Sequence, residues 1–331
     1  MELPVEDLEL VHALQISPRA TWSDLGLALD RHPTTLAARW ARLHGGGLVW
    51  VTGHLAGDPR QSCTALVRVS VTEHLRDGAV RGLQAIPEVA TVEEVADDGA
   101  LRLVVLTADW RHLASETLSR IREIAGVAGM DVVLSTRMYA LGNNWRLDVL
   151  AAEQQRRLAG LRLAAEAHAR NVPPLFGRML PLLARNGRAT AAELATDLGV
   201  HPSTAGRQLR AAVASGFLTF RCELAQDFSG YPIACHWFVR VPPADMEATV
   251  AFLRRHRTLR LCAAISGSAN LTFHLWLRTP ADIVELEEQL QAAVPTVTII
   301  QSSVCVRTHK RLGWLLKPDS TCTGEVVPQV L

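Results

Sequence analysis

The sequence predicts an α+β protein made of two copies of one unit, a helix-turn-helix domain followed by a ferredoxin-like β-α-β-β-α-β domain. Three observations lead to this prediction. The chain has 331 residues, the length of about two domains. It repeats itself once, at an offset of 169 residues. Within each repeat, segments with helical periodicity come first and strand-like segments follow.

The repeat is clearest at the start of each copy. Residues 20–35 read ATWSDLGLALDRHPTT, and residues 189–204 read ATAAELATDLGVHPST. At nearly the same offset, LRLVVLT (101–107) aligns with LTFHLWL (271–277). The chain is therefore read as two diverged copies of about 165 residues. We expect residues shared by the two copies to be needed for the fold, and residues that differ to give the copies different functions.

Three short helices are predicted at the start of copy two. Residues 175–185 have apolar helical spacing and end at an Asn-Gly pair. Thr190 opens a Thr-Ala-Ala-Glu capping box, whose hydroxyl and carboxylate satisfy backbone donors at a helix start, and that helix stops at Gly199. Pro202 suits the first position of the third helix because proline has no N–H to lose there. Helices separated by a tight glycine turn predict a helix-turn-helix.

The elements that follow have the order β-α-β-β-α-β in both copies. In copy two a strand at 217–224 comes first, and the unit itself is 234–241, 243–256 (helix), 259–266, 271–277, 280–293 (helix) and 296–308. In copy one they are 63–71, 74–86 (helix), 89–95, 101–106, 110–124 (helix) and 132–138. This order predicts an antiparallel sheet with two helices on one face.

These elements divide the chain into six segments. They are a first helix-turn-helix (1–55), a first ferredoxin-like domain (61–146), a linker helix (147–173), a second helix-turn-helix (174–222), a second ferredoxin-like domain for effector binding and assembly (232–315) and a tail (316–331). The linker helix is predicted because residues 147–170 are rich in Ala, Leu, Glu, Gln and Arg.

Composition excludes several classes of protein. Hydrophobic residues make up 48% and charged residues 20%, which is typical of globular chains. No stretch reaches about 18 apolar residues, and the acidic start lacks a signal-peptide pattern. We therefore expect a cytoplasmic protein without a membrane partner. The six cysteines form no C-x-x-C pair and no zinc-finger spacing, so no metal site is expected.

The net charge of the chain is +1, but the two halves have net charges of opposite sign. Residues 1–150 carry 14 basic and 19 acidic side chains, which gives −5. Residues 151–331 carry 20 basic and 14 acidic side chains, which gives +6. A basic second half permits a polyanionic partner.

Residues 190–220 resemble the DNA-binding motif of the Lrp/AsnC family of transcriptional regulators. The segment LATDLGVHPST (194–204) follows the family pattern, with Arg207 near its arginine position, and residues 25–51 carry a weaker version. The β-α-β-β-α-β unit resembles the effector-binding and assembly domain of the same family. The resemblance implies a sequence-specific regulator that binds double-stranded DNA and responds to an amino acid or related metabolite. It also implies an internal pseudodimer that self-associates further.

The expected DNA contacts lie near the start of each third helix, where small polar and cationic groups reach phosphates and base edges. The candidates are His32, Thr34, Thr35, Arg39 and Arg42 in copy one, and His201, Ser203, Thr204, Arg207 and Arg210 in copy two. The alternative is an ordinary solvated helix. The two histidines have an alternative role as helix caps. Trp40 fits the buried face of its helix better than a DNA contact.

The effector pocket of the family borders a glycine-containing loop between the two central strands. The corresponding residues here are Ser266, Gly267, Ser268 and Asn270, with Ala269 in place of the aromatic residue of the family pattern. Backbone N–H groups and short polar side chains could receive a small polar ligand there. The alternative is a plain hairpin turn, because Gly and Asn are routine turn residues.

No catalytic signature is present, so the sequence predicts a non-enzyme with no catalytic residues and no cofactor. Ser266-Gly267-Ser268 is not a nucleophile elbow, and no phosphate-binding loop or H-E-x-x-H motif occurs. One alternative is an enzyme similar to siroheme decarboxylases, which resemble the same architecture in paired halves and use histidine and arginine to handle tetrapyrrole carboxylates. Another alternative is a ligand-sensing assembly protein that does not bind DNA.

Overall fold

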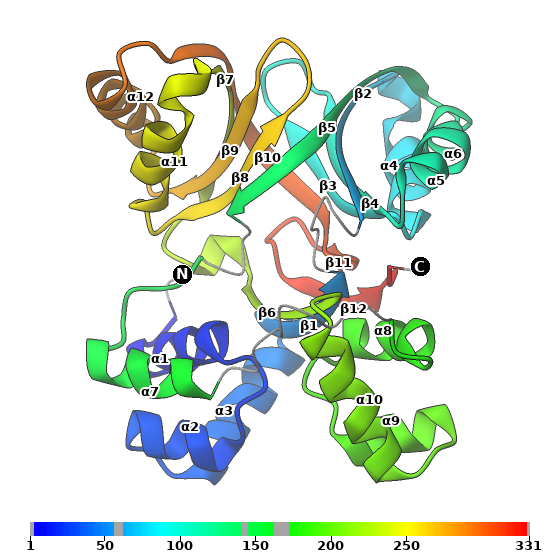
Figure 1. Cartoon of the computed structure of the whole chain (residues 1–331), viewed down its shortest axis with the longest axis vertical. Helices are drawn as coiled ribbons and strands as arrows, with labels where there is room; N and C mark the ends of the chain where they lie inside the picture. Colours follow the sequence, from blue (N-terminus) through cyan, green and yellow to red (C-terminus); the bar gives the residue numbers. More distant parts are fainter. Residues whose placement is uncertain (1–2, 56–61, 141–144, 162–171, 330–331) are drawn as a thin grey trace.

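The computed structural model describes residues 3–55, 62–140, 145–161 and 172–329. Figure 1 shows two similar halves side by side, with the helix-turn-helix modules at one end and the ferredoxin-like units at the other. The predicted fold class, α+β with two copies of this pair of domains, is confirmed.

Each helix-turn-helix module has three helices. In copy one these are α1 (Val5–Ile16), α2 (Trp22–Leu29) and α3 (Pro33–Gly45), and in copy two they are α8 (Phe176–Arg185), α9 (Ala191–Leu198) and α10 (Pro202–Ala214). The predicted capping box is present, because the Thr190 hydroxyl accepts a bond from the N–H of Glu193 and the Glu193 carboxylate accepts one from the N–H of Thr190. Gly199 has a φ of +67°, the left-handed conformation that ends α9.

The two modules are joined by a two-stranded antiparallel ribbon. It consists of β1 (Val49–Leu55) and β6 (Leu218–Leu224), and Thr52 lies opposite Arg221 in its register. Two equivalent arginines also cross between the modules. Arg19 donates to the carbonyls of Gly187 and Ala189, and Arg188 donates to those of Pro18 and Ala20. Burial lowers the pKa of both guanidinium groups to about 10.

The ferredoxin-like units follow the predicted order. In copy one they are β2 (Cys63–Val71), α4 (Arg76–Ala85), β3 (Val89–Val95), β4 (Leu101–Thr107), α5 (Trp110–His112), α6 (Leu118–Arg122) and β5 (Val127–Ala140). In copy two they are β7 (Ile233–Arg240), α11 (Met246–Arg254), β8 (Leu259–Ile265), β9 (Leu271–Leu277), α12 (Ala281–Ala293) and β10 (Thr298–Arg311). The helix predicted over 110–124 is divided by a π-helical turn at Leu113–Thr117.

The two sheets join into a closed ring of eight strands. The order is β10-β3-β4-β2-β5-β8-β9-β7, and β7 pairs again with β10. Two long strands make the junctions. The first part of β5 pairs with β2 of its own unit and its last residues pair with β8, while β10 pairs first with β7 and then with β3. The expected internal pairing of the two units is therefore present.

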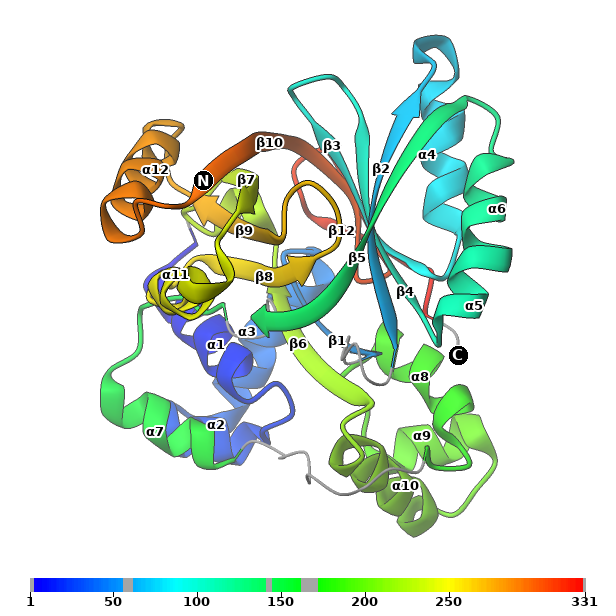
Figure 2. The same ribbon diagram turned by 45° about the horizontal axis from the view of Figure 1, so that its top comes forward.

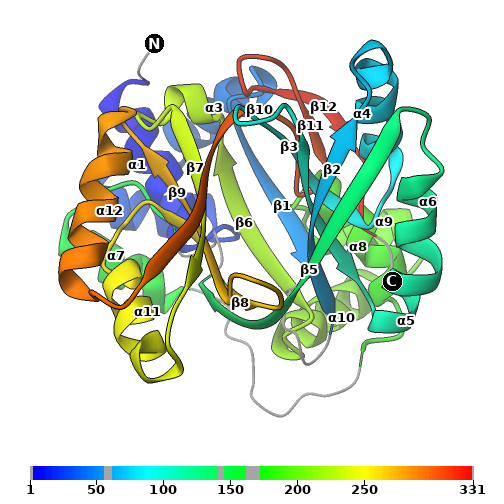
Figure 3. The ribbon, with the colours of Figure 1, turned by 90° about the horizontal axis from the view of Figure 1, so that it is seen from above.

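The helices cover the outer faces of the ring, as seen from above in Figure 3. Each unit has its own apolar core between its helices and its sheet, with residues such as Leu83 in copy one and Leu253 in copy two fully buried. A smaller apolar cluster between the sheets brings together Leu66 and Val133 of copy one and Phe238 of copy two. The inner faces of the two sheets therefore contact each other.

The segment after β10 differs from the tail expected at 316–331. Strands β11 (Trp314–Leu316) and β12 (Cys322–Val326) form an antiparallel hairpin next to β10 (Figure 2). Trp314 donates from Nε1 to the carbonyl of Ala184, and its ring lies 5.7 Å from that of Trp50. The hairpin therefore ties the ferredoxin-like units to the helical modules. Both strands are too short to give a periodic signal in the sequence.

The connection between the copies begins with α7 (Ala152–Gly160), within the predicted linker helix at 147–173. Residues 162–171 of that prediction lie outside the described residues. Among the described residues, no helix is long and apolar enough to cross a membrane.

Candidate active site

A cavity of about 100 Å³ lies where the ribbon meets the ring of strands. Its wall contains residues from both copies and from most strands of the ring. Copy one provides His54, Leu55, Thr64, Thr91, Glu93, Val104, Leu106 and Met138. Copy two provides Arg221, His236, Arg260, Leu261, His274, Trp276, Arg311 and Leu312. We call this space the central cavity.

Three arginines of copy two give the central cavity its charge, and Arg260 and Arg311 are each 4% exposed. Arg260 donates from Nη2 to both carboxylate oxygens of Glu223, at 3.1 and 2.8 Å, and Arg221 pairs with the same carboxylate. Arg311 donates to the side-chain oxygens of Gln226 and Thr308. Burial alone would raise the pKa of Glu223, but the three guanidinium groups outweigh it and lower that pKa to about 2.

Several polar atoms around the central cavity are buried and lack a partner. Within the described residues, they are Thr64 Oγ1, His54 Nε2, Arg260 Nη1, His274 Nε2, Trp276 Nε1 and Arg311 Nη1. A buried polar atom without a partner costs free energy, so such atoms are uncommon and usually bind a ligand or water. Four of these six belong to copy two, and two of those four are guanidinium nitrogens. The arrangement therefore suits an anion that can accept several hydrogen bonds.

Two stacked histidines stand beside a buried carboxylate. The rings of His236 and His274 lie 4.0 Å apart at 21°, and His236 Nε2 lies 2.9 Å from Glu93 Oε2. Burial opposes ionisation of Glu93, yet His236 and the neighbouring cations hold its pKa well below the usual range. Burial first, then His236, lowers the pKa of His274, so its imidazole is neutral near pH 7.

A third histidine lies on the ribbon. His54 Nδ1 donates to the carbonyl of Leu55, so the neutral ring has its lone pair on Nε2. Burial, reinforced by Arg221, lowers the pKa of His54 to about 4. Because His54 and His274 are neutral near pH 7, the guanidinium groups are the dominant positive charges beside them.

The donor atoms of Glu93, His236 and His274 lie within 4.8 Å of one another, a set of three that could hold a metal ion. Their number matches a catalytic zinc site with three protein ligands. The surroundings do not fit a zinc site, because Arg260 and Arg311 line the same space and would repel a divalent cation. We therefore assign no metal to this group.

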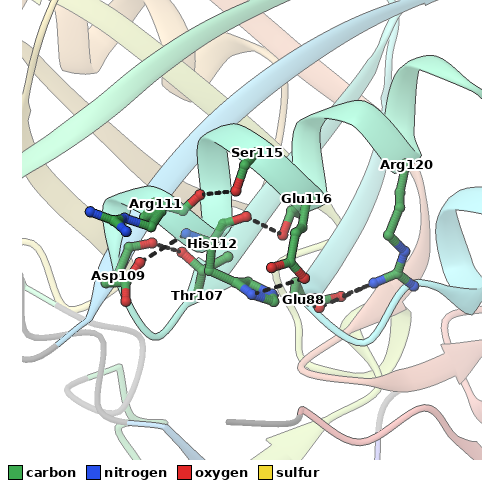
Figure 4. A network of polar contacts seen from close by, with 9 residues as sticks. Glu88, Thr107, Asp109, Arg111, His112, Ser115, Glu116 and Arg120 are labelled. Atoms are coloured by element: carbon green, nitrogen blue, oxygen red, sulfur yellow. Dashed lines mark hydrogen bonds and ion pairs between the residues drawn. The ribbon is translucent and has the colours of Figure 1, made fainter.

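A second polar cluster lies beside the helical segment that follows β4 in copy one (Figure 4). Glu88 is 3% exposed and accepts hydrogen bonds from His112 Nε2 at 3.0 Å and from Arg120 Nη1 at 3.1 and 3.0 Å. Burial alone would raise the pKa of Glu88, but the bond from His112 and the charge of Arg120 lower it. None of these three residues lines the central cavity. The cluster anchors the helical segment after β4 to the start of β3.

The predicted DNA-binding residues lie on α3 and α10, at the opposite end of the molecule from the ring (Figure 1). His201 acts as a helix cap, because its Nδ1 accepts a bond from the N–H of Ser203. His32 instead contacts the Thr34 hydroxyl at 2.7 Å. Thr35 is exposed and Thr204 is partly buried. Trp40 packs against the core of its module, as expected.

The arginines of the two third helices differ in their surroundings. In copy one, Arg39 and Arg42 both pair with Asp7, which is fully buried, at 3.0 and 2.5 Å. In copy two, Arg207 and Arg210 are exposed. The residue at the position of Asp7 in copy two is Phe176, which has no charge. The first pair is therefore bound to a carboxylate of its own module, although the Arg42 side chain is 57% exposed, whereas both arginines of the second pair are exposed with no such carboxylate at the corresponding position.

The predicted effector loop binds to its own surroundings. Ser266 Oγ accepts a bond from the N–H of Leu134, and the Asn270 side chain makes two 2.8 Å bonds with the backbone of Val241. Arg240 donates to the carbonyls of Gly267 and Ser268. These loop residues do not line the central cavity. Their geometry fits the alternative interpretation, a hairpin turn.

The residues of the central cavity are not among those predicted from the sequence. A signal was present, because Arg260 and His274 interrupt otherwise apolar strands in LRLCAAI and LTFHLWL. A charged or polar residue inside a buried strand is rare unless it is paired or functional. The convergence of these residues from β6, β7, β8, β9 and β10 could be seen only in the structure.

Comparison with solved structures shows two full-length matches. Siroheme decarboxylase NirDL in complex with an iron-uroporphyrin III analogue is 14% identical, with 92% of each chain covered and a TM-score of 0.56. Another structure of siroheme decarboxylase NirDL is 15% identical, with the same coverage and a TM-score of 0.53. The leucine response regulatory protein LrpA of Mycobacterium tuberculosis is 17% identical, covering 40% of this chain and 92% of its own, with a TM-score of 0.34. No protein-family model and no curated protein sequence matches.

The matches support a tandem Lrp-like fold and correct one expectation. Both full-length matches are structures of an enzyme, so the prediction that this chain is not an enzyme is wrong. The identity as a transcriptional regulator is not supported at full length, because neither of these two matches is a structure of a regulator.

Proposed function

We propose that the chain is a decarboxylase that acts on a carboxylate-bearing tetrapyrrole. The observation that carries the proposal is the set of unpartnered donors on Arg260, Arg311 and Trp276 around one buried cavity. The proposal is supported by the fold, which this chain has in common with a siroheme decarboxylase over 92% of its length.

The size of the central cavity limits what enters it. Pockets for whole drug-sized ligands measure roughly 300–1,000 Å³, whereas this cavity measures about 100 Å³. It therefore receives one carboxylate arm of the tetrapyrrole, and the macrocycle stays outside. One arm is decarboxylated at a time.

The arginines bind and orient the arm. Nη1 of Arg260 and of Arg311 donates to the carboxylate oxygens, and charge-assisted bonds of this kind are about twice as strong as neutral ones. The apolar side chains of Val104 and Leu106 exclude water from the bound carboxylate. Loss of hydration favours departure of neutral CO₂.

The histidines complete the reaction. The bond between the methylene carbon and the carboxylate carbon breaks, CO₂ leaves, and the electron pair spreads into the conjugated ring. A proton then passes from the His236–His274 pair to the methylene carbon, which becomes a methyl group. Glu93 accepts a hydrogen bond from His236 and balances the charge of its protonated form.

The test uses the full chain, siroheme under anaerobic conditions, visible absorbance for binding and mass spectrometry for loss of CO₂. Arg311→Gln should weaken binding, and His274→Gln should retain binding but lose turnover by about 10²–10⁴-fold. His309→Gln is the matched control, because His309 lies two residues before Arg311 on β10 but does not line the cavity. Absence of both an absorbance change and CO₂ loss in the wild type would refute the proposal.

A second candidate function is DNA binding through α10. The observation that favours it is the exposure of Ser203, Arg207 and Arg210 along one helix. Cationic and small polar groups near the start of such a helix contact phosphates and base edges. Selection of bound genomic fragments by the purified chain would test it, and failure to shift any fragment would remove it.

A further inference from the structure

One histidine of the central cavity has no part in the reaction proposed above. His54 lies on strand β1 of the ribbon and is 6% exposed. Its Nε2 is buried and has no partner among the described residues. The proposed proton donors, His236 and His274, lie on the ring of strands in copy two, whereas His54 comes from copy one and from outside the ring. The role of His54 therefore has to follow from its own contacts.

The contacts of His54 fix the position of its proton. Its Nδ1 lies 2.8 Å from the carbonyl oxygen of Leu55, which can only accept a hydrogen bond, so Nδ1 carries the proton. Because burial, and then the charge of Arg221, lowers its pKa to about 4, the ring is neutral at pH 7. The lone pair is therefore on Nε2, and His54 offers a hydrogen-bond acceptor to the cavity.

The unpartnered nitrogens on the arginines and the tryptophan of copy two are donors. Nη1 of Arg260, Nη1 of Arg311 and Nε1 of Trp276 all carry hydrogen, which suits the carboxylate of a substrate arm. A carboxylate has no hydrogen to give, so it cannot bind to the lone pair of His54. The acceptor on His54 therefore needs a second partner, one that donates a hydrogen bond.

A water molecule is the smallest donor that fits this space. A buried water needs about 10–15 Å³ of cavity volume, and the central cavity measures about 100 Å³. Such a water also needs about two to four polar partners. The Thr64 hydroxyl is a further unpartnered group of copy one in the same wall, and a hydroxyl both donates and accepts. The copy-one wall of the cavity therefore suits a water, as the arginines suit a carboxylate.

The position of His54 depends on the C-terminal segment. The N–H of Leu55 donates to Oε1 of Gln329 at 3.0 Å, and the carbonyl of Leu55 accepts from His54. Gln329 is 3% exposed and does not line the central cavity. It therefore acts on the cavity through Leu55, because it holds the backbone that holds the imidazole ring.

The stoichiometry of decarboxylation gives the water a function. Each turnover replaces a carboxylate by a hydrogen, so one proton is consumed for each CO₂ released. The His236–His274 pair gives up this proton and needs another from solvent before the next turnover. We propose that His54 binds a water through Nε2, that this water passes a solvent proton to the histidine pair, and that Gln329 is a positioning residue for His54. This inference rests on the proposed decarboxylation.

The test compares the first turnover of the full chain on siroheme with the later ones, under anaerobic conditions. His54→Phe keeps a ring but removes the acceptor. It should bind siroheme and release the first CO₂ at the wild-type rate, because the histidine pair already holds a proton. Later turnovers should slow about tenfold or more. His54→Gln keeps an acceptor and should slow them less, and Gln329→Leu should also slow only the later turnovers.

The state of His54 is measured without siroheme by ¹⁵N NMR of the full chain. The wild type should have a proton on Nδ1 and none on Nε2, and Gln329→Leu should give a mixture of the two tautomers. His44→Phe is the matched control, because His44 Nδ1 also contacts a backbone carbonyl, that of Val49 at 3.1 Å, but does not line the cavity. This variant should turn over siroheme like the wild type.

Three results would overturn the inference. They are a proton on Nε2 of His54, equal losses in the first and later turnovers of His54→Phe, and later turnovers that stay at the wild-type rate in that variant. In the last two cases the wild type still releases CO₂, so the decarboxylase proposal stands. A wild type that releases no CO₂ would instead refute the decarboxylase and the proton return together.

Discussion

The two copies share a scaffold but differ in chemistry. Their backbones correspond closely, since the N–H of Trp276 donates to Thr258 in copy two just as that of Leu106 donates to Glu88 in copy one. Positions 170 residues apart therefore correspond in the two copies. In the central cavity, Trp276 of copy two corresponds to Leu106 of copy one, and His274 corresponds to Val104.

The charged groups follow the same division. All three arginines of the central cavity belong to copy two, and the counterpart of Arg260 in copy one is Ala90. Copy one contributes one carboxylate, Glu93, and most of the apolar wall. The two copies therefore have the same fold, and the arginines of the central cavity lie in only one of them.

The strongest test of the comparison is to separate the copies. Each unit leaves β5 or β10 half paired without the other, because the ends of these strands complete their hydrogen bonds across the junctions. Residues 1–146 and 171–331 expressed alone should be insoluble or self-associated, and coexpression should give a one-to-one complex. Size-exclusion chromatography with light scattering measures this. Two stable monomers that do not bind each other would show that the ring is not needed for folding.

The next largest effect is expected from the charges of copy two. Arg260→Ala leaves the buried carboxylate of Glu223 with fewer partners, and breaking a buried ion pair costs about 3–5 kcal/mol. The free energy of unfolding from urea titration measures this cost. Arg260→Met combined with Glu223→Gln should recover only part of the stability, because Arg221 then loses the same carboxylate. A loss below about 1 kcal/mol in the single variant would contradict the network described for the cavity.

A smaller effect is expected on DNA binding, where the arginines of α10 and α3 should differ. If α10 binds DNA, Arg207→Ala and Arg210→Ala should each cost about 1–3 kcal/mol of binding free energy. Arg39→Ala should cost less, because Arg39 is already bound to Asp7. Binding isotherms at fixed salt measure the difference. Equal losses in both copies would remove the distinction drawn between the helices.

The smallest effect concerns Lys310, the cation that copy one buries. Burial lowers its pKa from 10.5 to about 7 in the folded state, so the unfolded chain binds more protons between these values. Its contribution to the free energy of unfolding therefore rises with pH from about 7 to about 10, by at most about 1.4 kcal/mol per pH unit, and is constant below 7.

Subtracting the unfolding curves of Lys310→Met from those of the wild type isolates this contribution from other titrating groups. The difference should increase with pH across that window. Ala140→Met, at the end of β5, is the control, because no charge is buried at that position. A difference that stays flat with pH would show that Lys310 keeps an ordinary pKa in the folded protein.

Local pattern predicted the elements better than it predicted their ends. Strands β2, β3 and β9 have the predicted bounds, because each is an apolar run limited by turns. Strand β5 was predicted over 132–138 and spans Val127–Ala140, and β10 continues to Arg311. The extra residues at the end of each strand pair with the other unit, as Lys310 does with Val92, while those at the start of β5 pair with β2 of the same unit. A polar segment such as the end of β10 has no strand periodicity of its own.

The candidate site was harder to predict than the fold. The recognition-helix residues form one continuous motif, whereas Glu93 and His236 are separated by 143 residues and meet at 2.9 Å. Only the closure of the ring brings them together. For the loop at 266–270, the sequence suggested a ligand site that the contacts do not support. The residue types, such as Asn270, are typical of a ligand site, but the Asn270 amide is hydrogen-bonded to the backbone of Val241.

The position of the central cavity between the copies has a consequence for how such a site can arise. In a dimer of identical subunits, the common interface is isologous, and every residue near the axis occurs twice. A homodimer of copy two would bring a second Arg260 and a second Arg311 to the same cavity of about 100 Å³. Their mutual repulsion would oppose assembly. Covalent fusion removes this constraint, since one substitution then changes one wall only. The single chain can therefore evolve a polarised site where a symmetric pair could not.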